Sequence, residues 1–365
     1  MKINVHATAV AVSLVALGAS PARAQVYGSL ANFDAVNDTG QVAHGFEIDI
    51  EDPSYDHTKI YSVFGLDRNF GVPPTSVERY GAPTITDLPG VGVTVRYQGS
   101  FAGNAWNIGT PTGPYPFAGD SCWPLGNAQY ASGTLTCDHF GVATLGNPAK
   151  VTYNWLIDPS NTGLLTPQVA ALPAVNFAYQ APPPGPVPAL RPVVAEIEAH
   201  KDANEVFGKA YWVKVFAKHV DHNVELNNLL EHNADVPKDA EVEAEFEIFQ
   251  AGDINNNGNG KKAFADLALN PADAALVLRF EFYKYLGNLS AEGEALCGGK
   301  AGGGPALPAN CGGLGDYVGA QIAGFNAVQP PLAVPEPGSY AMLLAGMGVL
   351  GWVARRRSGD RGTNC

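Results

Sequence analysis

The sequence predicts an all-β protein. Several segments alternate apolar and polar residues with a period of two, which is typical of strands that are buried on one face. Gly (42) and Pro (28) are abundant in the 365 residues, and both favour turns over long helices. Even the Glu-rich segment 241–249 keeps a strict alternation that argues against a helix. The predicted strands lie at 45–51, 91–97, 150–156, 193–200, 210–219, 241–249 and 276–286.

The Pro-rich stretch at 181–188 predicts a stiff linker between two β domains. Each domain is expected to be a β-sandwich of the immunoglobulin-like or fibronectin-III-like kind, although the Cys-Trp-Cys spacing of true immunoglobulin domains is absent. A turn or short helix is expected at 225–232. The predicted parts are a first domain at 25–180, the linker at 181–190, a second domain at 191–287, a Gly-rich extension at 288–334 and a tail at 335–365.

The charge distribution excludes nucleic-acid binding as a function. The chain has a formal charge of −13, and its few basic residues are concentrated at the two ends. Residues 25–335 carry 16 Lys and Arg against 33 Asp and Glu, which is a net −17. A body this acidic repels phosphate backbones and anionic lipid headgroups.

The N-terminus has the features of a secretory signal peptide. Lys2 precedes an apolar run at 7–17, and the small-residue site Ala22-Arg23-Ala24 follows it. The apolar run is too short for a transmembrane anchor. Signal peptidase is therefore expected to cleave after Ala24 and to leave Gln25 as the first residue.

The C-terminal tail combines three features in a fixed order. Pro335-Glu336-Pro337 is an extended motif that exposes its backbone, because proline excludes a helix there. An apolar stretch at 340–354 predicts a short transmembrane helix, slightly below the ~20 residues of a full span. The three arginines that follow would remain on the cytoplasmic side and stop transfer; they are Arg355, Arg356 and Arg357.

This arrangement resembles the PEP-CTERM sorting signal. The resemblance implies recognition of Pro335, Glu336 and Pro337 by a membrane processing enzyme of the exosortase type, a transient helix at 340–354 and a stop-transfer signal made by the three arginines. Residues 358–365 extend beyond the usual end of such tails. The segments 28–34, 44–48, 78–83 and 319–326 also resemble uncharacterised ectodomains that carry this signal, and they bring no known activity.

Four of the five cysteines form two local pairs in Gly- and Pro-rich surroundings. An exported chain meets an oxidising compartment, so we expect disulfides between Cys122 and Cys137 and between Cys297 and Cys311. Four cysteines allow two other pairings. A zinc site would need a closer spacing than either pair offers.

Three weak motifs are interpreted as structural. Ser121 follows Gly-Asp as in one class of esterases, but no histidine in the chain has an Asp three positions before it. His219 and His222 would face opposite sides of a strand, so they do not predict a metal site. The segment 253–264 begins like a calcium loop but ends in Phe264, where a glutamate would be needed.

Aromatic residues in the loop-like segment 99–137 are the candidate ligand contacts. Trp106, Tyr115 and Trp123 lie outside any strand pattern, where aromatic faces can stack on sugar rings. The alternative is that these rings cover the protein core beneath a long loop. Trp155 and Trp212 lie in predicted strands and are expected in the core.

The sequence thus predicts a non-enzymatic protein that needs no cofactor or metal. It would be exported through the inner membrane, held transiently by its C-terminal helix, and then reach the cell surface or the extracellular matrix. A structural role associated with biofilm exopolysaccharide is the leading hypothesis, with signal peptidase and an exosortase-type enzyme as processing partners. The alternatives are a carbohydrate-binding protein and, less favoured, a secreted hydrolase on a β scaffold.

Overall fold

A computed structural model describes twelve stretches of the chain, all within one compact unit that spans residues 24–328. The predicted signal peptide and the C-terminal tail lie outside the described residues. The described residues are 25–67, 76–111, 137–145, 148–179, 191–198, 204–222, 243–252, 261–264, 268–269, 275–297, 307 and 311–326.

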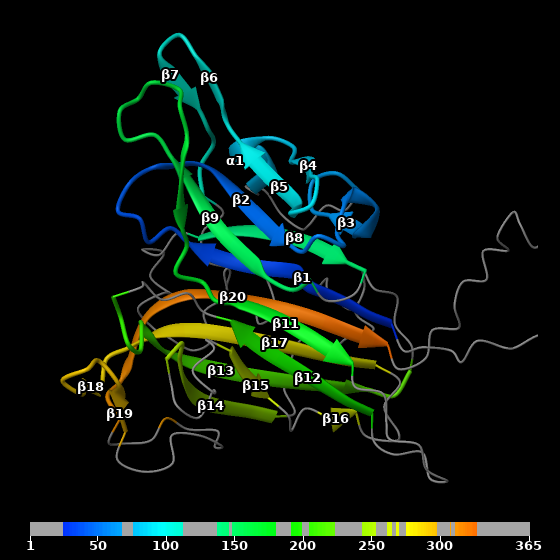
Figure 1. Ribbon diagram of the computed structural model, residues 1–365, viewed down its shortest axis with the longest axis vertical. Coiled ribbons are helices and arrows are strands. Elements are labelled where there is room, and N and C mark those ends of the chain that lie inside the picture. The colour runs from blue at the N-terminus through cyan, green and yellow to red at the C-terminus, as the bar shows by residue number, and fades with distance from the viewer. Residues whose placement is uncertain are drawn as a thin grey trace, which may run out of the picture. The chain divides into compact units, whose positions relative to one another are not determined.

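Most of the described part forms strands, which confirms the all-β class (Figure 1). The largest sheet has seven strands in the order β14-β13-β17-β20-β1-β8-β3. Its neighbours in this order are antiparallel. The strands are β14 (Glu243–Gln250), β13 (Ala210–Val220), β17 (Ala275–Tyr285), β20 (Leu314–Asn326), β1 (Gln25–Val36), β8 (Cys137–Thr144) and β3 (Ile60–Val63).

Two further sheets have five and four strands. The five-stranded order is β10-β9-β2-β5-β4, and the smaller sheet contains β11-β12-β15 with β16 paired to β12. The strands of the first are β10 (Thr166–Val169), β9 (Val151–Ile157), β2 (Ala43–Glu51), β5 (Gly92–Gln98) and β4 (Thr84–Leu88). Those of the second are β11 (Ala174–Tyr179), β12 (Arg191–Glu198), β15 (Lys261–Phe264) and β16 (Ala268–Leu269).

The remaining elements are short. Two hairpins consist of β6 (Ser100–Ala102) with β7 (Ala105–Asn107) and of β18 (Asn288–Leu289) with β19 (Ala295–Leu296). The described helices are η1 (His57–Lys59) and α1 (Ser76–Tyr80). No helix among the described residues is long and apolar enough to cross a membrane.

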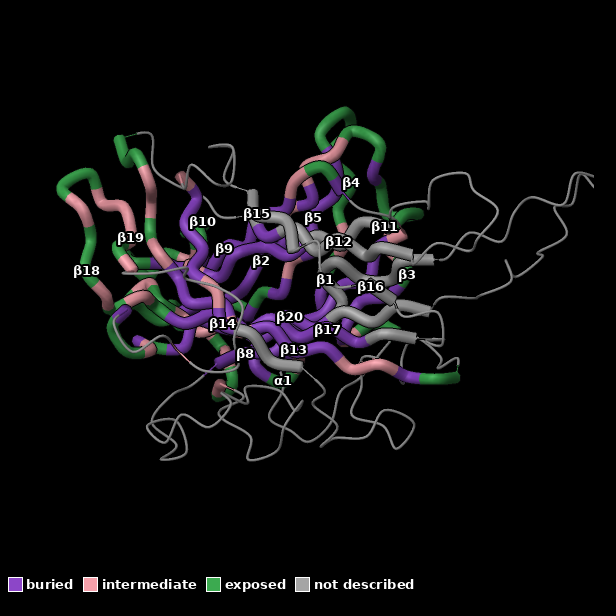
Figure 2. The backbone as a smooth tube through the Cα atoms, turned by 90° about the horizontal axis from the view of Figure 1, so that it is seen from below, coloured by how far each residue is buried: buried purple, intermediate pink, exposed green. Residues whose placement is uncertain are grey.

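One apolar core joins all three large sheets. In the seven-stranded sheet, Phe33, Gln321, Phe280 and Val215 stand opposite one another in a single cross-strand row, so they share a face. The apolar members of this row belong to the same core cluster as Trp155 of the five-stranded sheet and as Ala174, Val175 and Ile197 of the four-stranded one. Both smaller sheets therefore pack on the same face of the large sheet. Figure 2 shows that the buried residues follow the strands, while exposed residues gather at the turns.

The seven predicted strands are confirmed to within two residues at each end, and Trp155 and Trp212 are fully buried as expected. The predicted two-domain division is corrected by the sheet order. The large sheet combines β1, β3 and β8 from the first predicted domain with β13, β14 and β17 from the second. The proposed boundary at 181–190 therefore does not separate two sheets. The expected turn or helix at 225–232 lies outside the described residues.

The predicted Gly-rich extension 288–334 is also corrected. It contains β20, a central strand of 13 residues that pairs with β17 on one side and β1 on the other. Gly319 has a φ of +155°, and a Cβ built there would lie 2.1 Å from the carbonyl oxygen of Asp34. The glycine therefore serves a close approach of two strands rather than a flexible linker. Residues 99–137 are likewise not all loop, since β6 and β7 lie there.

Candidate functional site

The two ends of the folded unit lie beside each other. Gln25, the first residue after the predicted signal peptide, stands opposite Asn326, the last residue of β20. Eight residues, 327–334, then lead to Pro335. The predicted leader and the predicted tail therefore both join the β unit at the same end of the β1–β20 pair.

The predicted processing residues themselves lie outside the described residues. For the signal peptide these are Ala22 and Ala24, and for the sorting motif they are Pro335, Glu336 and Pro337. The expected transmembrane helix at 340–354 lies outside as well. The same holds for the three stop-transfer arginines, Arg355, Arg356 and Arg357.

A buried polar row crosses the face of the large sheet opposite the common core. Lys214, Glu281, Ala320, Asp34 and His139 stand opposite one another on five successive strands. His139 Nδ1 lies 2.6 Å from Asp34 Oδ1. No local pattern predicts this row, because its members come from segments up to about 290 residues apart.

Arg279 links the two carboxylates of this row. Its Nε donates a hydrogen bond of 2.9 Å to Glu281 Oε1, and its Nη2 lies 4.0 Å from Asp34 Oδ2. The Tyr283 hydroxyl donates to the other oxygen of Glu281 at 2.8 Å. Ala320 of β20 stands between these two carboxylates, opposite both Glu281 and Asp34.

Burial shifts the pKa values of the charged side chains in and beside this row. Burial raises the pKa of Glu281 above its ordinary value, although its contacts with Arg279 and Tyr283 act in the opposite direction. Burial alone would lower the pKa of Arg279, but the charges of Glu281, Tyr317 and Asp34 and the hydrogen bond to Glu281 together outweigh it, so the net shift is upward. Arg279 thus remains a permanent cation between two acidic groups, as expected of a structural ion network.

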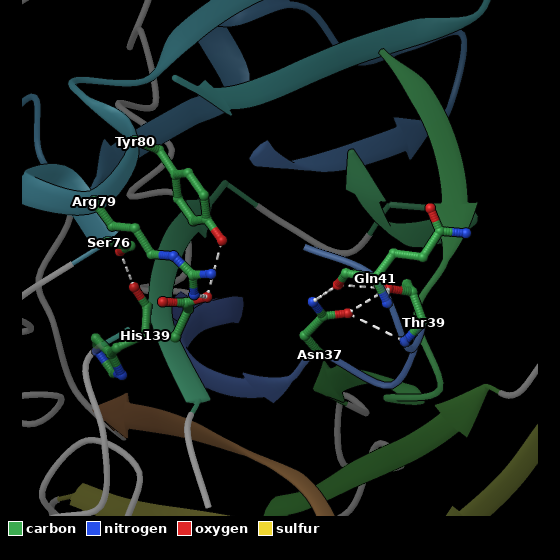
Figure 3. Close-up of polar contacts among 8 residues, drawn as sticks. Asn37, Thr39, Gln41, Ser76, Arg79, Tyr80 and His139 are labelled. Carbon is green, nitrogen blue, oxygen red and sulfur yellow. Dashed lines mark hydrogen bonds and ion pairs between the residues drawn. The ribbon is translucent and has the colours of Figure 1, made fainter. Parts of the chain in front are cut away.

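A second buried ion pair lies at the edge of the common core. Arg79 and Tyr80, at the end of α1, both donate to Oδ2 of Asp138 on β8, the hydroxyl at 3.1 Å (Figure 3). The Ser76 hydroxyl, at the start of the same helix, donates to the backbone carbonyl of His139. These bonds fasten α1 to β8.

The third cluster contains a predicted ligand contact, Trp106. Its indole N–H donates to Asp158 Oδ2 at 3.0 Å, and its ring stacks on His44 with centroids 4.7 Å apart. Phe101, opposite it in the hairpin, lies 5.2 Å away at 59°. Trp106 is half-buried, so it both covers the protein beneath it and presents part of its ring to solvent. Tyr115 and Trp123 lie outside the described residues.

Two turns hold the Trp106 cluster in place. Asp158 also accepts the backbone N–H of Gly163 at 2.7 Å, which closes the turn after β9. The side chain of Asn161 in this turn donates to the backbone oxygen of Asn104 at 3.1 Å, in the turn between β6 and β7. Both asparagines have a positive φ. Burial lowers the pKa of His44, so the ring that supports Trp106 favours its neutral form.

The turn between β1 and β2 is closed by its own side chains (Figure 3). Asn37 Nδ2 donates to the carbonyl oxygen of Gln41, and Thr39 Oγ1 donates to Asn37 Oδ1, both at 2.7 Å. This turn carries the chain from the large sheet to β2 and on to His44.

The predicted disulfides and the weak motifs are described only in part. The Cys297–Cys311 disulfide is present, and Cys137 is disulfide-bonded, while its expected partner Cys122 lies outside the described residues. Ser121 and the segment 253–260 also lie outside. His222 contacts Asp221 at 2.8 Å, and no group of three or more metal-ligating side chains occurs within the described stretches.

Comparison with known proteins identifies the tail. Residues 333–357 match the PEP-CTERM protein-sorting motif, which confirms the resemblance noted from the sequence. The match includes Arg355 and Arg356 and ends at Arg357, so residues 358–365 lie beyond it. No curated protein and no solved structure matches the chain.

Proposed function

We propose that the chain is an exported surface protein that is sorted by an exosortase, because it carries a PEP-CTERM sorting motif. We propose that signal peptidase removes residues 1–24, that the helix at 340–354 holds the chain transiently in the membrane, and that cleavage at the tail then passes the β unit to the cell surface or the matrix. The motif at 333–357 carries this proposal. The pairing of Gln25 with Asn326 supports it, because each segment to be removed continues from a strand end of the β unit and not from within a sheet.

The sorting step is tested by changing the motif in the full-length chain. Replacing Pro335, Glu336 and Pro337 by Ala should leave the tail attached and keep the protein in the inner membrane. The matched control replaces Pro330 and Pro331, which precede the matched segment, and should be processed normally. Equal loss of the tail in both variants, measured by intact mass and cell fractionation, would refute the proposal.

At its destination, the protein is proposed to have a structural role in the exopolysaccharide matrix. The acidic, β-rich body and the two disulfide-bonded regions suit a protein that works outside the cell. The proposal includes no enzymatic activity. A panel of chromogenic glycosides and esters tests this, and turnover by purified 25–334 above that of a heat-treated sample would favour the hydrolase alternative.

Carbohydrate binding is the second candidate function, and the geometry of Trp106 favours it. Hydrogen bonding to Asp158 and stacking on His44 fix the indole in one orientation before any ligand arrives. Exposed Asn104 and Asn161 are beside it as hydrogen-bond partners for hydroxyl groups. An aromatic ring with neighbouring amides is the usual chemistry of a sugar subsite.

A pulldown of purified 25–334 with exopolysaccharide from its own source cells tests this second function. Saturable binding at low micromolar protein, reduced at least tenfold by Trp106→Ala, would support it. Tyr61→Ala is the matched control, because Tyr61 is an exposed aromatic residue on the far edge strand β3. Equal binding by all three proteins would exclude Trp106 as the contact, and no binding at all would favour the structural role.

A further inference from the structure

The strand that precedes the sorting motif is also the strand that completes the large sheet. β20 lies between β17 and β1, which come from chain segments about 240 residues apart. At one end Leu314 stands opposite Tyr285, and at the other end Asn326 stands opposite both Ala275 and Gln25. Without β20, the facing edges of β1 and β17 would both lack a partner strand.

On the common-core face, side-chain hydrogen bonds hold β20 to the two smaller sheets. Gln321 is fully buried, and its Oε1 accepts from the Tyr153 hydroxyl at 3.1 Å and from the Val175 N–H at 3.2 Å. Its Nε2 donates to the Val175 carbonyl at 3.1 Å. One side chain of β20 therefore fastens a strand of each smaller sheet to the large sheet.

On the opposite face of the sheet, an ion network joins the two strands that flank β20. Arg279 on β17 contacts Glu281 on its own strand and approaches Asp34 on β1, across the small Ala320. Breaking one partner of such a buried network leaves an uncompensated charge. Opening of β20 would therefore disrupt bonds on both faces together.

The start of β20 is tethered. The Cys297–Cys311 disulfide closes three residues before Leu314, and it joins the end of the β18–β19 hairpin to the beginning of the last strand. This covalent link keeps β20 close to β17 while the rest of the strand is still unpaired. Closing the sheet then costs less chain entropy.

We propose that β20 closes the β unit and that this closure confines proteolytic processing to residues 327–334 and the sorting motif. Before closure, the whole stretch that follows Cys311 is an unpaired chain that proteases of the envelope can cut. After closure only eight residues separate Asn326 from Pro335, and they span at most about 29 Å. The tail step of this inference rests on the proposed sorting function, whereas the closing role of β20 does not.

The closing role is tested with purified 25–334 and chymotrypsin. Tyr317 lies within β20 and is 1% exposed, so cleavage after it reports opening of the strand. Gly319→Ala places a Cβ against the Asp34 carbonyl, and Gly313→Ala is the matched control, because a Cβ there meets nothing within 4 Å. We expect cleavage after Tyr317 to be at least about tenfold faster in Gly319→Ala than in wild type, and unchanged in Gly313→Ala.

A second variant, Gln321→Leu, removes the hydrogen bonds of Gln321 to Tyr153 and Val175 without introducing a larger side chain. Cleavage after Tyr317 should be accelerated to the same extent. Wild-type rates of cleavage after Tyr317 in both variants would overturn the closing role. Equal acceleration in the Gly313→Ala control would also overturn it, because the effect would not then depend on the contacts of β20.

The effect on processing is tested with the full-length chain in its source cells. Wild-type chains should have a single C-terminus at the sorting motif, whereas Gly319→Ala chains should also end within 314–326. A single identical C-terminus in both would overturn the confinement of processing. Wild-type chains that keep their tail would instead refute the sorting proposal, and the chymotrypsin result would still decide the closing role.

Discussion

The Gln321 contacts allow a substitution whose effect should depend on pH. Gln321→Glu keeps the shape of the side chain and changes only its amide nitrogen to oxygen. A protonated carboxyl reproduces the native bonds, because its carbonyl can accept from Tyr153 and the Val175 N–H while its O–H donates to the Val175 carbonyl. An ionised carboxylate has no donor, so it faces the Val175 carbonyl without a hydrogen bond.

Burial sets the sign and the size of the effect. The site is fully buried, so the pKa of the new carboxyl rises in the folded state relative to about 4.3 in the unfolded chain. Stability is therefore fully present below the unfolded pKa and is lost as pH rises through the folded pKa. Full burial raises a carboxyl pKa by about three units or more, and each unit corresponds to about 1.4 kcal/mol. The variant should lose about 4 kcal/mol relative to wild type between pH 4 and about pH 8.

Urea unfolding of 25–334, followed by tryptophan fluorescence at several pH values, measures this loss. Gln168→Glu is the matched control, because Gln168 is exposed on the edge strand β10. It should follow the wild-type pH profile within about 0.5 kcal/mol. A Gln321→Glu profile parallel to that of wild type would refute the hydrogen-bonding account of this site.

Three further predictions concern other contacts. Arg79→Met should destabilise the protein by about 3–5 kcal/mol in urea unfolding, because it leaves Asp138 buried without its cation, and adding Asp138→Leu should recover part of the loss. Cys297→Ser should cost about 3 kcal/mol and remove the sensitivity of the melting temperature to reductant at this loop. Burial lowers the pKa of His44, so the contribution of its neutral ring to stability is present above about pH 6.5 and is lost as the pH falls. The melting temperature of His44→Gln should therefore decrease less than that of wild type between pH 7 and about pH 5.

The positions of individual strands could be predicted because they depend on local patterns. The segments 210–219 and 276–286 alternate in a way that only a strand satisfies, and they became β13 and β17. Alternation tells which residues share a face, but it does not tell which strand lies alongside. The two strands that flank β20 come from opposite ends of the chain, and no local signal predicts their meeting.

β20 itself could not be predicted, because glycine weakens the strand pattern. Gly315, Gly319 and Gly324 interrupt the apolar alternation of 314–326 and resemble a flexible extension. At Gly319 the structure gives the reason, since the β1 backbone leaves no room for a Cβ. A glycine in a strand can thus indicate the close approach of a neighbouring backbone, and not only a weak tendency to form a strand.

The residues of the candidate sites could be predicted only in part, because local patterns do not show which distant residues meet. Charged residues within an apolar strand usually mark a solvent-exposed face, yet Arg279 and Glu281 are both buried. Trp106 could be singled out because it lies outside a strand pattern. Its partners Asp158 and His44 could not be, because a single Asp or His near a turn is not distinctive.

The positions of the tail and of the Trp106 cluster follow from one strand. β1 begins at Gln25, opposite Asn326 of β20, and Ala35 near its other end stands opposite Gly319. These positions are seven residues apart on β20, so at about 3.3 Å per residue about 23 Å separates them. From Val36 one turn leads to His44, on which Trp106 stacks. The proposed ligand contact and the point where the tail leaves β20 therefore lie near opposite ends of β1. A substitution at Trp106 should leave tail removal unchanged, and an intact tail should leave any sugar binding by the β unit unchanged, because the two points are at opposite ends of the strand.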